Sequence, residues 1–140
     1  MSDCCKGKEP KPGASECCAG GGEERVVLFY ACSGAANVAE IADHAARQMM
    51  AAGHGAMFCL AGVGAGIGGM VQTAKDADLN IIIDGCPMGC GKKIFDQAGI
   101  TNYMQITVTD LGIEKVKGAP CSEGEVQVVV KKAKEAVEKA

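Results

Sequence analysis

The sequence predicts an α/β protein built as a three-layer open parallel sheet of about four strands. Short segments such as residues 26–31 are apolar throughout, which is typical of strands buried on both faces of a parallel sheet. They alternate with segments in which apolar residues recur at helical spacing. At 140 residues, of which 48% are hydrophobic, the chain is long enough for one domain with its own core.

The first predicted strand is RVVLFYA, residues 25–31, because it is β-branched and aromatic. A helix follows, with apolar residues at Val38, Ile41, Ala42, Ala45 and Met49 and an end at Gly53. Ser33 or Asn37 is the expected cap of this helix.

AMFCLA, residues 56–61, is the second predicted strand. The glycine-rich VGAGIGG, residues 63–69, and a short helical segment at 70–77 connect it to the third strand, residues 79–84. A helix at 92–97 then precedes the fourth strand.

The fourth predicted strand covers residues 103–108, and Ser122 with Glu125 forms a capping box before a closing helix. Right-handed crossovers favour a central first strand with the second and third beside it. This arrangement is Rossmann/flavodoxin-like, and its ligand sites lie at the carboxyl ends of the strands.

Residues 1–24 differ in composition from the rest, and we expect a disordered, cysteine-rich tail there. Its two cysteine pairs form a candidate second metal site: Cys4, Cys5, Cys17 and Cys18. Residues 25–140 are then the α/β metal-binding domain.

Composition argues against several classes of function. A formal charge of −3 and 4% aromatic residues make nucleic acid an unexpected partner. The N-terminus has no apolar signal segment, and no apolar run is long enough to cross a membrane, so we expect a cytoplasmic protein. Nine cysteines in that compartment favour metal or redox chemistry over disulfides. Protein partners are not indicated.

Four cysteines are expected at one edge of the sheet. Cys32 follows the first strand, Cys59 lies near the end of the second, and Cys86 and Cys90 follow the third. Neighbouring strands lie roughly 4.8 Å apart, and two thiolates on one zinc ion are just under 4 Å apart, so adjacent strand ends can share an ion. Ser33, Gly34 and Asp84 are expected to orient these ligands.

Three motifs in this order, CSGAANVAEIADHAAR, MFCLAGVG and IDGCPMGCGKK, resemble the DGC-domain family, named for the tripeptide Asp84-Gly85-Cys86 here. The resemblance runs from about Val27 to Gly112. Members are described as candidate zinc-binding proteins with four cysteines, without an established reaction. The resemblance implies the same ligands, Cys32, Cys59, Cys86 and Cys90.

Two alternatives stay open. An iron–sulfur cluster uses the same four thiolates, although the compact CxxCxxC spacing of many cluster sites is absent here. A thiol redox or sulfur-carrier enzyme would use Cys86 and Cys90, whose three-residue spacing departs from a CxxC dithiol. Whether the protein is an enzyme is therefore left open.

Other patterns carry less weight. The turn after Cys32 resembles a phosphate-binding cysteine loop but has no arginine before Arg47. The glycines at 64, 66 and 69 match GxGxxG, yet such a glycine-rich loop matches many patterns. His44 is expected at the surface, and Cys121 has no assigned role.

Overall fold

The structure is a computed structural model that describes residues 24–140. The cysteine pairs expected to bind a second metal lie outside these residues. Within them, four parallel strands form one sheet in the order β2-β1-β3-β4. The strands are β1 (Val27–Ala31), β2 (Ala56–Met57), β3 (Leu79–Asp84) and β4 (Tyr103–Thr107). The predicted fold class and the central position of the first strand are confirmed.

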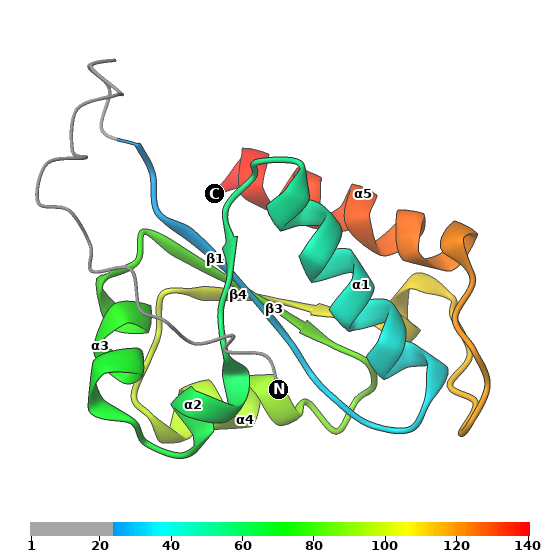
Figure 1. The fold of residues 1–140 in the computed structure, drawn as a ribbon, viewed down its shortest axis with the longest axis horizontal. Coiled ribbons are helices and arrows are strands. Elements are labelled where there is room, and N and C mark those ends of the chain that lie inside the picture. Colours follow the sequence, from blue (N-terminus) through cyan, green and yellow to red (C-terminus); the bar gives the residue numbers. More distant parts are fainter. Residues whose placement is uncertain (1–23) are drawn as a thin grey trace, which may run out of the picture.

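Helices cover both faces of the sheet, as Figure 1 shows. One face carries α1 (Asn37–Ala51) and α5 (Glu123–Lys139), and the other carries α2 (Leu60–Gly64), α3 (Gly68–Asp76) and α4 (Cys90–Gln97). A short 3₁₀ helix, η1 (Val108–Leu111), follows β4. None of the helices in the described part of the chain combines the length and apolarity needed to cross a membrane.

The alternation of side chains along β1 and β3 divides the core into two clusters. Phe29, Ile81 and Ile83 pack toward α1 and α5. Tyr30 and Ile82 pack toward the opposite layer, where Tyr30 meets Phe95 edge-on at a centroid distance of 4.8 Å. Because both faces of these strands are buried, most of their residues are apolar and do not alternate with polar ones; Asn80 and Asp84 on β3 are buried polar exceptions.

The second strand is shorter than residues 56–61. After Met57, the backbone N–H of Phe58 still donates to the carbonyl of Phe29 at 2.8 Å, and pairing then ends. Cys59 caps α2 instead, because its sulfur accepts a hydrogen bond from the N–H of Gly62. The prediction that Cys59 lies within a strand was therefore wrong.

The expected cap of the first helix was also wrong. Ala36 occupies the cap position and provides no side-chain hydrogen bond. Asn37 is buried, and its side chain instead bonds the backbone of Glu114 and Val116. The capping box of Ser122 and Glu125 at the start of α5 is confirmed.

The turn after β3 lies against the start of α1 at Gly85. A Cβ atom at this position would lie 2.9 Å from Val38 Cγ2 and 3.0 Å from the backbone carbon of Val38. The backbone of Val38 cannot move aside as the end of a flexible side chain can, so only glycine fits at position 85. This close approach lies beside the carboxyl ends of β1 and β3, where the chain order of the sheet reverses, which is the usual ligand position in open α/β folds.

We therefore expect Gly85→Ala to destabilise the fold by about 1–3 kcal/mol through overpacking. Gly124→Ala is the matched control, because a Cβ there has no neighbour within 4 Å. Alanine should stabilise this position in α5 by up to about 1 kcal/mol. Urea unfolding measures both variants, and equal stabilities would contradict the close packing at Gly85.

Candidate metal centre at the carboxyl edge

Three of the four predicted cysteines line one cavity of about 310 Å³ at the carboxyl ends of β1 and β3. Cys32 follows β1, Cys86 follows β3, and Cys90 is the first residue of α4. Ser33 and Gly34, also expected near the site, line the same cavity. The sheet topology thus brings together thiols that are separated by more than 50 residues in the sequence.

Cys32 is held by the turn after β3. Its backbone N–H donates to the carbonyl of Ile83 at 3.1 Å, and its sulfur accepts the N–H of Gly85 at 3.1 Å. Burial raises the pKa of the Cys32 thiol, the hydrogen bond from Gly85 lowers it, and the nearby charge of Asp84 raises it further. A metal cation would favour the thiolate, because a coordinated thiol is deprotonated.

Cys86 faces a lysine from a distant loop. The ammonium group of Lys115 donates to the Cys86 sulfur at 3.4 Å. Asn37 fixes this loop, because its side-chain amide donates to the carbonyl of Glu114 at 2.9 Å and its oxygen accepts the N–H of Val116 at 2.7 Å. This loop therefore places the positive charge of Lys115 beside the Cys86 thiol.

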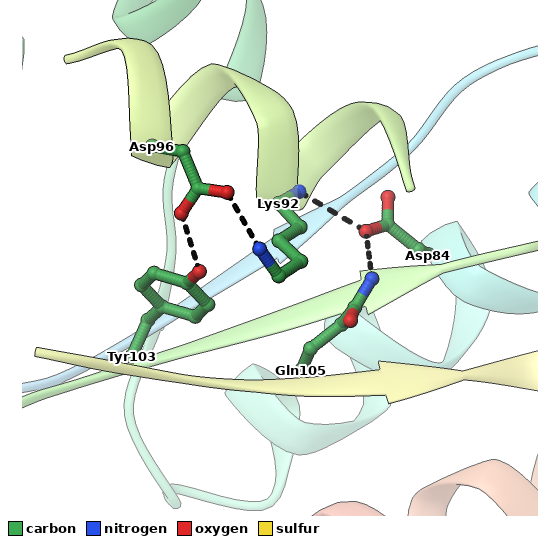
Figure 2. Close-up of polar contacts among 5 residues, drawn as sticks. All are labelled: Asp84, Lys92, Asp96, Tyr103 and Gln105. Carbon is green, nitrogen blue, oxygen red and sulfur yellow. Dashed lines mark hydrogen bonds and ion pairs between the residues drawn. The ribbon is translucent and has the colours of Figure 1, made fainter. Parts of the chain in front are cut away.

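Cys90 is positioned by the anchoring of α4 to β3. The buried carboxylate of Asp84 accepts the N–H of Gly91 at 2.7 Å and the N–H of Lys92 at 3.1 Å. Gln105 on β4 donates to the same carboxylate at 2.8 Å. Figure 2 shows Asp84 between Lys92 and Gln105. Gly89, with φ of 59° in the left-handed region, allows the sharp turn that precedes the helix.

Cys59 is placed differently from the other three. Its side chain is exposed at the start of α2 and does not line the cavity shared by the other thiols. The helix that follows packs against α4, where a Cβ at Gly64 would lie 3.2 Å from Ile94. Cys59 and Cys90 thus both begin helices in the same layer of the fold.

The donor set fits a thiophilic metal. Thiolates with N–H donors to sulfur are the chemistry of zinc and iron–sulfur sites. Within residues 24–140, no three of the four sulfurs lie within 4.8 Å of one another. A tetrahedral zinc ion requires sulfur separations of just under 4 Å, so binding requires side chains at this edge to move closer. Cys59 and Cys90 are the exposed members of the set.

A further group of side chains that could hold a metal ion was not expected from the sequence. Glu40, His44 and Cys121 place their ligand atoms within 4.8 Å of one another. The four-residue spacing of Glu40 and His44 predicts that they share one face of a helix. The position of Cys121 beside them depends on the tertiary fold and could not be predicted from this spacing. Burial, the charge of Glu40 and a hydrogen bond to Glu40 raise the pKa of the Cys121 thiol.

Comparison with known proteins identifies two similarities. Residues 28–133 match the family model described as DGC domain. The chain is also similar to the anaerobic and virulence modulator AnvM of Pseudomonas aeruginosa, with 31% identity over 99 residues, which cover 71% of this chain and 76% of that protein. No solved structure matches.

The anchoring of α4 can be tested with Asp84→Asn. An amide side chain has one acceptor oxygen in place of two, so at least one of the three donors around residue 84 loses its partner. We expect a loss of about 1–3 kcal/mol in the free energy of unfolding, measured by urea denaturation.

Asp96→Asn is the matched control on the same helix. Asp96 pairs with Lys92 in an exposed contact at 2.6 Å, and exposed pairs contribute less than about 1 kcal/mol. If both variants lost equal stability, Asp84 would not be the anchor of α4.

Proposed function

Because this chain belongs to the DGC-domain family, we propose that it binds one zinc ion through four cysteines at the carboxyl edge of its sheet. The ligands are Cys32, Cys59, Cys86 and Cys90. The observation that carries this proposal is that three of these thiols line a single cavity. They come from two segments of the chain, the turn after β1 and the turn between β3 and α4, which the sheet topology brings to that cavity.

The charges around the cavity support binding of a metal thiolate centre. A zinc ion with four thiolates carries net negative charge, which is costly to bury without compensation. Lys115 and Lys117 line the cavity, and the ammonium group of Lys115 already contacts the Cys86 sulfur. The N–H of Gly85 supplies a further donor to the Cys32 sulfur. These groups offset the charge of the thiolates.

Ser33, Gly34 and Asp84 take the supporting roles in this proposal. Asp84 acts through the backbone of α4, because it binds the N–H groups of the two residues that follow Cys90. Ser33 and Gly34 form the wall of the cavity beside Cys32. Within residues 24–140, the hydrogen bonds to the sulfurs of Cys32 and Cys86 come from Gly85 and Lys115.

Four protein ligands complete a tetrahedral coordination sphere. Zinc in such a site has no open position for a reacting water molecule, so the proposed role is structural, sensory or metal-handling in the cytoplasm. The relative in Pseudomonas aeruginosa is named a modulator. In a modulatory role for this chain, binding or loss of the metal would change the conformation of the loops that supply the ligands.

A thiol redox or sulfur-carrier role is the second candidate. The contact between Lys115 and Cys86 favours it, since a neighbouring ammonium group is typical of reactive cysteines. Zinc bound to Cys86 would suppress this chemistry, because a metal-bound thiolate is a poorer nucleophile. A measurement of the zinc bound to the protein therefore distinguishes the two candidate functions.

The N-terminal pairs, Cys4 with Cys5 and Cys17 with Cys18, extend the proposal to a second ion. Four thiols on residues 1–24 can satisfy a tetrahedral metal. In this arrangement the segment serves the α/β metal-binding domain, residues 25–140, as a metal-handling arm.

The test is the metal content and absorbance spectrum of untagged, anaerobically purified protein and of its Cys86→Ser variant. We expect colourless wild-type protein, and loss of one zinc equivalent together with a lower melting temperature in the variant. Removal of a structural zinc ion eliminates binding free energy that stabilises the fold. Met88→Leu is the control, because Met88 lies in the same turn and is 61% exposed.

Unchanged zinc content and melting temperature in Cys86→Ser would contradict the proposed centre. A brown protein that contains iron and acid-labile sulfide would assign the four cysteines to an iron–sulfur cluster. Metal-free protein with a rapidly alkylated Cys86 would favour the thiol-based enzyme.

A further inference from the structure

Glu40, His44 and Cys121 form a compact cluster on the outer layer of the sheet, between α1 and the start of α5. Their carboxylate, imidazole and thiol ligand atoms lie within 4.8 Å of one another. Within the described part of the chain, no other combination of three histidine, cysteine or acidic side chains meets this criterion. The cysteines of the carboxyl edge contribute nothing to this cluster.

The distance between Cys121 and His44 matches the requirement of a tetrahedral metal. Bond lengths of about 2.3 Å to sulfur and 2.05 Å to nitrogen place these two atoms about 3.6 Å apart on one zinc ion. In the structure, Cys121 Sγ and His44 Nδ1 are separated by 3.6 Å. An ion could therefore bind between them with little movement of either side chain.

Backbone and side-chain contacts hold the three ligands in place. Glu40 and His44 are four residues apart on α1 and so share one face of the helix. Glu40 Oε2 accepts the backbone N–H of Cys121 at 3.1 Å, which fixes the segment before α5 against α1. One turn beyond His44, Gln48 donates to Glu123 at 2.9 Å, which ties the two helices together again.

We propose that Glu40, His44 and Cys121 form a further metal site, distinct from the cysteine sites, that binds zinc-like divalent ions and fastens the start of α5 to α1. Carboxylate, imidazole and thiolate are all common zinc ligands. His44 and Cys121 are half-buried, whereas Glu40 is exposed, so the site is open to solvent on one side. Three protein ligands leave one coordination position for water or an exchangeable ligand.

A direct thiol–imidazole hydrogen bond is the competing explanation of the 3.6 Å contact. It requires no metal and leaves Cys121 accessible to alkylating reagents at all metal concentrations. Zinc binding instead converts Cys121 into a bound thiolate of low nucleophilicity. The response of Cys121 to zinc therefore separates the two explanations.

The experiment measures the alkylation rate of each cysteine in the full-length protein by peptide-resolved mass spectrometry, with and without added zinc. We expect zinc to slow alkylation of Cys121 on the order of tenfold or more in the wild type. His44→Ala should abolish this protection. His54→Ala is the matched control, because His54 lies in the turn after α1 and outside the cluster, and it should retain full protection.

Cys121 that reacts equally with and without zinc in the wild-type protein would overturn the proposal, as would full protection in His44→Ala. Glu40→Gln provides a second variant if His44→Ala does not fold, because the amide oxygen can still accept the N–H of Cys121. Protection that survives Glu40→Gln at the wild-type zinc affinity would likewise overturn the site. Because the mass spectrum reports Cys121 separately from the cysteines of the carboxyl edge, the result is independent of the four-cysteine centre.

Discussion

The parallel pairing of β1 with β3 is the constraint on which the candidate centre depends. Ala31 pairs with Ile83 at the end of this ladder, and the next residue, Cys32, still donates its N–H to the carbonyl of Ile83. The turn after β3 then returns the N–H of Gly85 to the Cys32 sulfur. Strand pairing within the sheet thus also positions the thiol of Cys32. The absence of a side chain at Gly85 allows the turn to pack closely enough for this contact.

Two anchors extend this arrangement to the remaining elements. Asp84 is buried at the end of β3 and accepts hydrogen bonds from the first turn of α4, so the start of this helix, where Cys90 lies, is held in place. Asn37 fixes the loop that carries Lys115 to Cys86. Both are buried polar side chains that hydrogen-bond backbone groups, as buried polar groups in proteins usually do. Cys59 stands apart, since it begins a short helix packed on α4.

The fold could be predicted from the sequence because the buried strands are mainly apolar and the helices carry their own periodicity. The end of the second strand before Cys59 could not be predicted, because AMFCLA has strand propensity. The hydrogen bond from the N–H of Gly62 to Cys59, which begins α2, corresponds to no recognisable sequence pattern. The gathering of Cys32, Cys86 and Cys90 followed from topology. The placement of Lys115 and Cys121 depends on loop contacts more than 70 residues apart in sequence, which no local pattern reveals.

The most direct test of the four-cysteine centre is a crystal structure of the zinc-loaded, full-length protein with anomalous diffraction data collected on both sides of the zinc absorption edge. We expect an anomalous peak at the carboxyl edge of the sheet, bonded to the sulfurs of Cys32, Cys59, Cys86 and Cys90 at about 2.3 Å. A zinc-loaded crystal with no peak among these sulfurs, or a peak bonded to fewer than four of them, would contradict the proposed centre.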